Sequence, residues 1–377
     1  MHEPFGVGLV GAGGFGAFCL EAYSELPEVR VVAVADTDLE RAQRVAPPRA
    51  TVSSDYRALL ADPAVQIVAI NTPPFLHGPM ARQAAEAGKH IFVEKPLATS
   101  LEEAVAAVEA ARAAGVTLSV DYVLRHHQLH RLAAEVVKSR ALGAFQHWSL
   151  ENFATDDNLP PDHWFWDHSR SGGIHVEHGV HFFDLCTHLA GTAPDEVAGC
   201  AQQRPDGRVD RVSATVRYGR RVLATFYHSF NQIGRFERTT IRLNFARGHI
   251  VTEGWIPTDL TLWGVVDEAG LGRLEALFGD RLEVRERFHG AASTVQHGGV
   301  TEHLAAAVAA EARAPERQLE YKRAVQAGMR DLVAAIRDNR PPEVSAADGL
   351  LSLAVALAAS DPETCGRPLP AIPDVAG

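Results

Sequence analysis

The sequence predicts an α/β first domain, with a parallel sheet between helices, and an α+β second domain with an open, mostly antiparallel sheet. From residue 1 to about 122, short apolar runs alternate with amphipathic stretches, which is typical of strands and helices in a doubly wound parallel sheet. Beyond 122, strand patterns of period two follow one another across tight turns, as in antiparallel hairpins. Because 377 residues are many for one core, we expect two domains, 1–122 and 123–377.

The elements of the first domain follow from its apolar periodicity. Its expected strands are the runs GVGLVG, VVAVAD, VQIVAINTPP, HIFVEKP and VTLSVDY. Its expected helices cover Phe15 to about Leu26, 38–46, 76–88 and 100–114. Gly88 and Gly115 stand where glycines end helices, which supports the boundaries of the last two.

The second domain combines hairpins with a few helices. The segments VSATVRYGRRVLATFYHSF and TTIRLNFARGHIVTEG predict strand pairs that turn near Gly219 and Gly248. Helices are expected near 128–140, 319–338 and 345–359, and the last of these could pack back towards the first domain. Region 257–300 has weak periodicity and several glycines, so we assign it no element.

Composition excludes several classes of protein. The net charge of -11 comes from 47 acidic and 36 basic residues without a long block of like charge, which argues against nucleic acid or anionic membrane as a partner. No apolar run reaches the ~18 residues that a membrane span needs, and MHEPFG lacks the features of a signal peptide, so we expect a cytoplasmic protein. The four scattered cysteines predict neither a disulfide framework nor a cysteine zinc site.

The most informative motif is VGLVGAGGFG, residues 7–16, in which an apolar run meets three spaced glycines. Gly11 allows a tight turn, Gly13 lets backbone amides approach a pyrophosphate, and Gly16 lets the following helix pack on the strand. Asp36 ends the next apolar run, 20 residues beyond Gly16, where a carboxylate can bind a ribose diol. This context predicts a Rossmann site for NAD, although a glycine-rich turn that binds nothing is the alternative.

Two further segments carry groups suited to chemistry. In HIFVEKPLA, a strand delivers Glu94 and Lys95 to the sheet edge where ligands bind, although these two side chains could simply form an ion pair. After Gly172 and Gly173, the helical spacing of SGGIHVEHGVHFFDLCTHLAG aligns polar side chains along one stripe. The members of this stripe are Glu177, His181, Asp184 and His188. Histidine suits proton transfer near neutral pH, and Glu177 could orient His181, although a purely structural histidine is the alternative.

Together these motifs resemble the glucose-fructose oxidoreductase and inositol dehydrogenase family (Gfo/Idh/MocA). The resemblance rests on GAGGFG, AVADTD, INTPPFLH, the EKP tripeptide and GG-x-x-x-E-x-G-x-H-x-x-D, and it extends to the ending SAADGLLSLAVALAASDPETCGRP. It implies NAD(P)-dependent oxidation or reduction of a sugar, cyclitol or related polyol, with Lys95 and His181 as the catalytic pair and Glu177 beside them. Asp36 favours NAD over NADP, whereas Arg41 and Arg44 leave use of NADP open.

The resemblance also implies a set of ligand contacts. The expected cofactor contacts are Gly11, Gly13, Gly14, Phe15, Gly16, Asp36, Asn71, Thr72, Pro73, His77, Glu94 and Lys95. The expected substrate contacts are Asp121, Arg125, Trp164, Trp166, Glu177 and His178. Asp121 and Glu177 depart from residues common in the family, where asparagine and aspartate are frequent, so substrate identity does not transfer directly.

Several alternatives remain open from the residues alone. His175, Glu177, His178 and His181 could be zinc donors, but their order differs from H-E-x-x-H and we expect no metal. Trp164 and Trp166 could face a sugar ring or merely anchor a loop, and Arg125 could be a solvated charge at a helix start. The rival functions are an NADPH-dependent reductase of an aldehyde, imine or enone and a non-catalytic dinucleotide sensor. An open sheet with one apolar face would support a homodimer or homotetramer.

Overall fold

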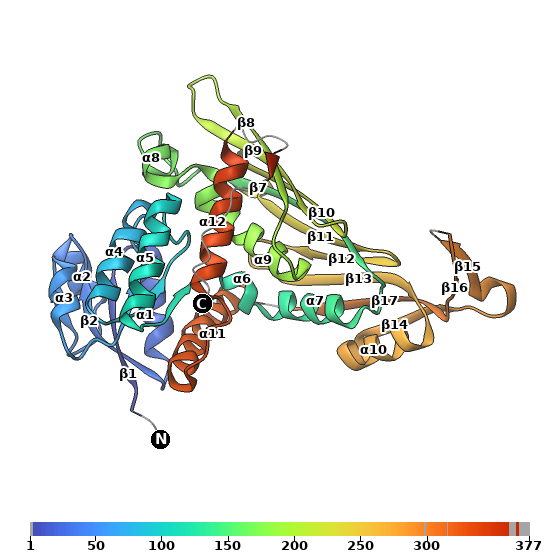
Figure 1. Cartoon of the computed structure of the whole chain (residues 1–377), viewed down its shortest axis with the longest axis horizontal. Helices are drawn as coiled ribbons and strands as arrows, with labels where there is room; N and C mark the ends of the chain where they lie inside the picture. The colour runs from blue at the N-terminus through green and yellow to red at the C-terminus, as the bar shows by residue number, and fades with distance from the viewer. Residues whose placement is uncertain (1–2, 298, 315, 362–366, 369–377) are drawn as a thin grey trace.

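The computed structural model describes residues 3–297, 299–314, 316–361 and 367–368. Figure 1 shows two parts side by side, a layered α/β domain formed by the N-terminal residues and a long, open sheet formed by the C-terminal residues. Helices α11 (Arg317–Asp338) and α12 (Ala346–Ser360) lie between them. The predicted fold class is confirmed in both parts.

The first domain is a six-stranded parallel sheet in the order β3-β2-β1-β4-β5-β6. Its strands are β1 (Phe5–Val10), β2 (Val29–Ala35), β3 (Thr51–Ser53), β4 (Ile67–Ile70), β5 (His90–Val93) and β6 (Leu118–Val120). Its helices are α1 (Gly14–Ser24), α2 (Leu39–Val45), α3 (Tyr56–Ala61), α4 (His77–Glu86) and α5 (Leu101–Ala114). The short β3 and α3 were not expected, because segments of three and six residues give too little periodicity.

The second domain is built on a ten-stranded sheet in the order β14-β17-β13-β12-β11-β7-β10-β9-β8-β18. Its strands are β7 (Phe145–Thr155), β8 (Glu196–Gln203), β9 (Val209–Tyr218), β10 (Val222–Gln232), β11 (Arg238–Phe245), β12 (Gly248–Glu253), β13 (Asp259–Val266), β14 (Leu282–Arg287), β17 (Ala306–Arg313) and β18 (Arg367–Pro368). Both expected hairpins are present, β9 with β10 and β11 with β12. They do not form a continuous meander, since β7 lies between β10 and β11 and runs parallel to β10.

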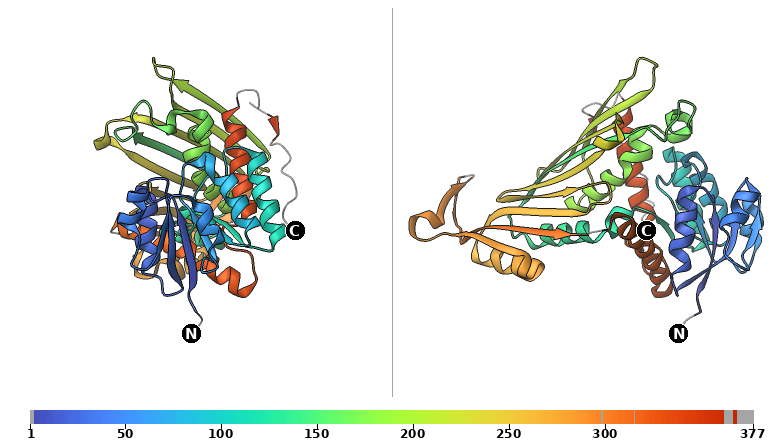
Figure 2. Two further views of the ribbon diagram at one scale, coloured as in Figure 1. Left: turned by 90° about the vertical axis from the view of Figure 1, so that its left-hand side faces the viewer. Right: turned by 180° about the vertical axis from the view of Figure 1, so that it is seen from behind.

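Region 257–300, to which the sequence assigns no element, supplies an extension at the far end of this sheet. It contains β13, β14, the helix α10 (Glu268–Phe278) and part of a separate hairpin of β15 (Thr294–His297) with β16 (Val300–His303). Figure 2 shows α10 and this hairpin at the end of the molecule farthest from the first domain. The region therefore contributes to the shape of the sheet and not to the interdomain cleft.

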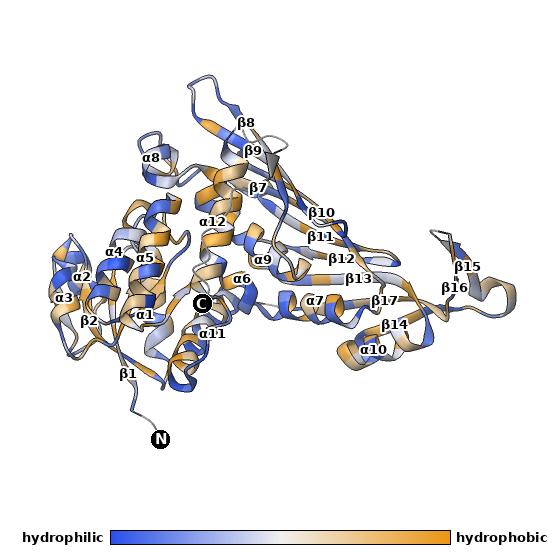
Figure 3. Ribbon diagram, viewed as in Figure 1, coloured by the Kyte–Doolittle hydropathy of each residue, from blue (hydrophilic) through white to orange (hydrophobic). Residues whose placement is uncertain are grey.

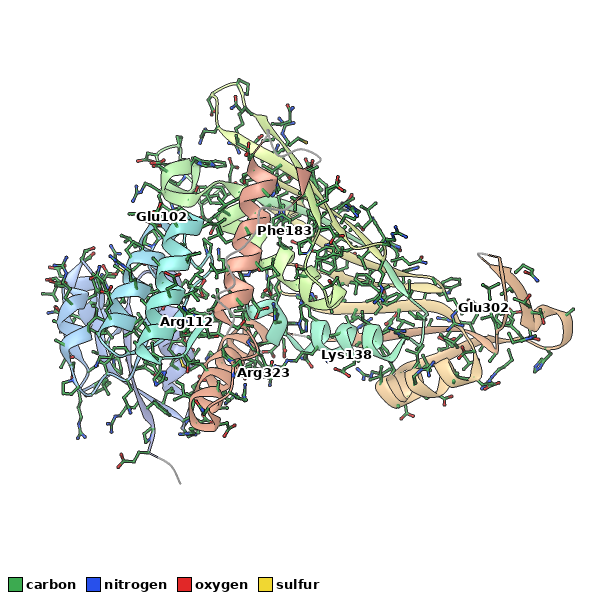
Figure 4. The ribbon with its side chains drawn as sticks, viewed as in Figure 1. Glu102, Arg112, Lys138, Phe183, Glu302 and Arg323 are labelled. Carbon is green, nitrogen blue, oxygen red and sulfur yellow. The ribbon has the colours of Figure 1, made fainter. Side chains whose placement is uncertain are left out.

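The remaining helices precede β8 in the chain, and one of them, α9, packs on a face of the large sheet. They are α6 (Val123–His126), α7 (Gln128–Ser139), α8 (His168–Ser171) and α9 (Val180–Ala190). On α9, Phe183 packs against Phe226 of β10 with ring centroids 4.6 Å apart, and Figure 4 labels Phe183 where helix and sheet meet. Phe183 and Phe226 are fully buried, which places the core of this domain between α9 and the sheet.

Helix α12 joins the two domains through an apolar surface. Figure 3 shows that its residues are predominantly hydrophobic along its whole length. Its Gly349 lies so close to the first domain that a Cβ there would meet Val120 Cγ2 at 2.7 Å. Just before the helix, the carbonyl of Val344 accepts a hydrogen bond of 2.8 Å from the Ser119 hydroxyl. The last helix thus packs on the Rossmann sheet as well as on α9.

The second face of the large sheet is open and carries both polar and apolar side chains, among the latter the exposed Leu223 and Trp263. A groove on this face is lined largely by hydroxyl and charged side chains, among them Ser149, Glu151, Thr215, Thr225 and Arg242. Threonine and serine suit a strand as well as valine does, so period two does not require apolar side chains on either face. Assembly through this sheet stays a prediction.

Candidate active site

A cleft of about 750 Å³ runs between the carboxyl edge of the parallel sheet and the start of α9. Its N-terminal wall is the glycine turn with the loops after β2, β4 and β5, and its C-terminal wall is the segment 164–181 with Trp255 and Tyr321. Most of the predicted site residues line this one cavity, although they are spread over more than 160 positions of the sequence. The arrangement agrees with the rule that ligands of open α/β sheets bind at the carboxyl ends of the strands.

The glycine turn is shaped to receive a phosphate group. Gly11 has a φ of 94°, and a Cβ at Gly16 would stand 1.9 Å from the Gly11 carbonyl oxygen, so both positions require glycine. In contrast, a Cβ at Gly13 or Gly14 would meet no atom within 4 Å, because both positions face open space at the start of α1. Free N–H groups at a helix N-terminus bind pyrophosphate well, so these residues fit a dinucleotide.

Asp36 is held firmly at the end of β2. Its carboxylate accepts hydrogen bonds from the backbone N–H of Ala12, at 2.7 Å, and of Asp38, at 2.9 Å. Arg41, which also lines the cleft, approaches the same carboxylate at 3.6 Å. The carboxylate therefore occupies the position expected for a ribose-binding acid, with a cation beside it that could face a 2′-phosphate.

The loop after β4 completes the cofactor side of the cleft. Asn71, Thr72, Pro73 and His77 line it, as the sequence predicts. The ring of His77 bridges two backbone carbonyls, with Nδ1 2.7 Å from Pro96 O and Nε2 2.7 Å from Thr72 O. This buried ring ties the loop after β4 to the loop that carries Lys95, and its burial lowers the histidine pKa.

Lys95 crosses the cleft to the second domain. Its Nζ donates to the Glu177 backbone carbonyl at 2.7 Å and to Glu177 Oε1 at 2.8 Å. The ion pair that the sequence allowed between Glu94 and Lys95 is therefore replaced by one between Lys95 and Glu177. Burial opposes ionisation of Glu177, but the Lys95 ammonium outweighs it and holds the carboxyl pKa below its usual range.

His181 stands one helical turn beyond Glu177 and lines the same cavity. Burial, assisted by the nearby positive charge of Lys95, lowers the pKa of His181 well below its usual value. Its ring lies edge-on to Trp255, with centroids 4.6 Å apart, and its Nδ1 has no hydrogen-bond partner among the described residues. A neutral imidazole and an ammonium group therefore face one space, an arrangement that can hold and deprotonate a hydroxyl group.

The helix that presents these groups is not a single α-helix. A π-helical turn covers His175–Gly179 and α9 begins at Val180. Glu177, His178 and His181 line the cleft, whereas Asp184 bonds to Arg125 away from it. π-helical turns are frequent at functional sites, where they redirect side chains. The predicted polar stripe is thus divided between the cleft and the joint of the two domains.

Three expected substrate contacts do not line the cleft. Asp121 is buried beside Glu94, below the cleft surface. Arg125 is enclosed in ion pairs with Asp184 and Asp348. Trp166 donates its indole N–H to Leu159 O at 3.0 Å and is covered by arginine side chains, so it anchors a loop. Its neighbour Trp164 does line the cleft. All four residues lie near a strand end or a motif in the sequence, and this proximity does not show which side chains line the cleft.

Other residues of the cleft were missed. Tyr321 on α11 reaches the glycine turn, where its ring packs 5.7 Å from Phe15. Trp255, in the turn after β12, covers His178 and His181. Arg170 extends over the ring of Phe75 at 5.0 Å, across the mouth of the cleft. No motif marks these positions. The only indication in the sequence is weak: Trp255 and Tyr321 are isolated aromatic residues in polar surroundings.

Neither a metal cluster nor a membrane-spanning helix is found among the described residues. Within the described ranges, no group of three or more histidine, cysteine, aspartate or glutamate side chains is arranged to hold a metal ion. Cys19, Cys186 and Cys200 are free thiols, while Cys365 lies outside the described residues. In the part of the chain that the structure describes, no helix is both long and apolar enough to span a bilayer.

Comparison with known proteins agrees with this geometry. The model of the Gfo/Idh/MocA oxidoreductase family with an NAD-binding Rossmann fold matches residues 5–122, and the model of the family's C-terminal domain matches residues 130–251. D-xylose 1-dehydrogenase (NADP(+)) 2 of Haloferax volcanii is 30% identical over 282 residues, covering 67% of this chain and 84% of that protein. scyllo-Inositol 2-dehydrogenase (NAD(+)) of Bacillus subtilis is 33% identical over 178 residues, covering 47% of this chain and 51% of that protein.

Among solved structures, levoglucosan dehydrogenase in complex with NADH and levoglucosan has the same fold. Its TM-score is 0.77 at 24% identity, with 98% of this chain and 100% of that chain covered. The first family model ends at residue 122 and the second begins at residue 130, and together they include Lys95, Glu177 and His181. The chain therefore belongs to the Gfo/Idh/MocA family of oxidoreductases, with an NAD-binding Rossmann domain.

Proposed function

We propose that this protein is an NAD-dependent dehydrogenase that oxidises a secondary alcohol of a sugar, cyclitol or related polyol. The observation that carries the proposal is the meeting of Lys95, Glu177 and His181, from two domains, in the cleft that also contains the glycine turn. When bound, the nicotinamide ring supplies the hydride acceptor. The protein must then orient the alcohol and receive its proton.

The roles of the side chains follow from their charges. The Lys95 ammonium, fixed by two hydrogen bonds to Glu177, can donate to the substrate oxygen and stabilise negative charge that develops on it. The neutral imidazole of His181 can accept the hydroxyl proton as hydride leaves the carbon. Glu177 holds the ammonium in place, so it is a positioning residue with respect to this step.

The walls of the cleft support a ring-shaped polyol as substrate. Trp164 and Trp255 present flat aromatic surfaces, which suit the apolar face of a sugar or cyclitol ring. The named relatives act on D-xylose and scyllo-inositol, and levoglucosan is the ligand of the structural neighbour. These names support a pyranose or cyclitol class for this protein.

The experiment is a screen of aldoses, cyclitols and anhydrosugars with NAD or NADP, followed by absorbance at the NADH wavelength. We expect turnover with at least one polyol and a higher kcat/KM with NAD. Lys95→Met and His181→Ala should each lower kcat by ~100-fold or more while NADH binding, followed by fluorescence, is retained. Lys138→Met is the matched control, since Lys138 is exposed and pairs with Glu135 far from the cleft (Figure 4).

Each outcome discriminates between functions. Near wild-type kcat in the Lys95 or His181 variant would refute the assigned roles. NADH binding without turnover of any polyol would favour a dinucleotide sensor. Reduction of aldehydes, imines or enones with NADPH, without polyol oxidation, would favour a reductase.

A further inference from the structure

Two carboxyl groups lie next to each other beneath the catalytic cleft. Strands β5 and β6 pair in parallel with Val93 opposite Val120, so Glu94 and Asp121 are the next residues of neighbouring strands. The backbone fixes both, since Asp121 N donates to Val93 O at 2.8 Å and Glu94 N donates to Ile70 O at 2.9 Å. The sheet therefore places the two carboxyl groups side by side at its carboxyl edge.

Three of the four oxygens of this Glu94–Asp121 pair lack a hydrogen-bond donor in the described part of the chain. Among the described residues, Glu94 Oε1 and both carboxylate oxygens of Asp121 find no donor, and all three atoms are buried. The two side chains also interact directly, since a hydrogen bond between them counteracts the rise that burial gives the pKa of Glu94 and adds to the rise in the pKa of Asp121. Two ionised carboxylates cannot share such a position without a large repulsion, so a proton between them is the arrangement that satisfies both.

The groups packed around the pair do not neutralise its negative charge, which therefore acts on the cleft. They are Cys19 and Tyr23 from α1, Lys95 at the end of β5, Glu177 from the π-helical turn and Tyr321 from α11. Burial raises the pKa of Cys19, Tyr23 and Tyr321, so these three are neutral at physiological pH. Lys95 is the one cation of this set, and its charge is already balanced by Glu177.

We propose that the Glu94–Asp121 pair holds one shared proton, and that its remaining negative charge makes the cleft bind the oxidised cofactor more tightly than the reduced cofactor. The oxidised nicotinamide ring carries a positive charge that the reduced ring lacks, and Glu94 lines the cleft. The pair therefore favours the cofactor form that starts the oxidation of an alcohol. This inference rests on the proposed function, because it requires the nicotinamide end of the cofactor to lie beside Lys95.

The pair also makes this preference depend on pH. Burial raises the pKa of Glu94 to about 7, and burial together with the charge of Glu94 raises the pKa of Asp121. Below this pH the pair holds two protons and is neutral, and above it the pair holds one proton and is negative. The ratio of NADH to NAD⁺ dissociation constants should therefore rise as pH increases through 7.

The test measures both dissociation constants between pH 6 and 8.5, with NADH followed by fluorescence and NAD⁺ by competition against it. In the wild-type protein we expect the ratio to rise about tenfold across this range, as one charge appears near the ring. In the double variant Glu94→Gln with Asp121→Asn, both amides keep the shape but cannot ionise, so the ratio should stay low at every pH. Glu102→Gln, an exposed change on α5 (Figure 4), should behave as wild type.

The single variants provide a second test if the double variant does not fold. In Glu94→Gln or Asp121→Asn, the remaining carboxyl group loses the shared proton that stabilises its charge, so the rise in the ratio should move to higher pH. A double variant with the wild-type ratio and pH dependence, or two single variants with an unchanged midpoint, would overturn the inference. A wild-type protein that binds both forms equally would overturn it while leaving the proposed function intact, whereas a protein that binds neither form would overturn both.

Discussion

The buried arginine at the joint between the domains gives the sharpest prediction about stability. Arg125 donates to both oxygens of Asp184, each at 2.6 Å, and to Asp348 Oδ1 at 2.8 Å. Its side chain is 7% exposed and that of Asp184 is 1% exposed. One guanidinium thus connects α6 to α9 and α12, away from the catalytic cleft.

Replacing Arg125 by methionine leaves two carboxylates facing each other without a counter-charge. Removing one partner of a buried ion pair costs about 3–5 kcal/mol in the free energy of unfolding. Replacing Arg125 by methionine and Asp184 by leucine together removes the uncompensated charge, so we expect the double variant to regain at least half of that loss. Arg131→Met is the matched control, because Arg131 is half exposed in its pair with Glu343 and should cost about 1 kcal/mol or less.

The assay is urea unfolding of the three variants and wild type, followed by tryptophan fluorescence, with steady-state kinetics at a temperature where all are folded. We expect KM for the polyol to change little in Arg125→Met, because Arg125 does not line the cleft. A variant with wild-type unfolding free energy and a strongly raised KM would refute this reasoning. Arg125 would then bind substrate, as the sequence suggests.

The remaining predictions concern the cofactor site and the effect of acid. Asp36→Ser should shift the ratio of kcat/KM for NAD and NADP towards NADP by about tenfold or more, since it removes a carboxylate that repels the 2′-phosphate; an unchanged ratio would contradict this role. Gly16→Ala should destabilise the domain, because its Cβ would stand 1.9 Å from the Gly11 carbonyl oxygen, whereas Gly14→Ala, with open space around it, should lower NADH affinity without changing the unfolding free energy. Equal effects of the two changes in urea titrations would count against the assigned geometry. Burial lowers the pKa of His130 to about 3, so between pH 5.5 and 4 the unfolded chain binds a proton there that the folded chain does not. The free energy of unfolding should therefore fall as pH decreases in this window. His130→Gln should reduce the slope of this free energy against pH by about 1.4 kcal/mol per pH unit. Unfolding curves at several pH values test this, and an unchanged slope would contradict it.

Local sequence predicts much of the cofactor side of this site. The glycines, Asp36 and the residues after β4 and β5 line the cleft because their positions follow from the order of strands and turns along a short stretch of chain. Lys95 and His181 were also identified, through the spacing of motifs in each half. For these residues, the backbone that precedes them determines where they lie.

Other positions depend on contacts between distant segments. Asp121 and Arg125 follow β6 directly, and the sequence assigns both to the substrate, yet one joins Glu94 and the other joins Asp184. Trp255 and Tyr321 enter the cleft from a turn and a helix that no motif marks. Their roles depend on how α9, α11 and α12 pack, which is a property of the assembled core.

By itself, the sequence determined the fold class and the dinucleotide turn, and it predicted Lys95 and His181, both of which line the cleft. Periodicity and the conformational demands of glycine act over a few residues, so they can be recognised in the chain before it folds. Only the tertiary structure decided which ionisable side chains pair with each other: Lys95 with Glu177, Arg125 with Asp184, and Glu94 with Asp121. In a buried site the cost of an unpaired charge is so high that the partner, and not the residue alone, sets what each side chain can do.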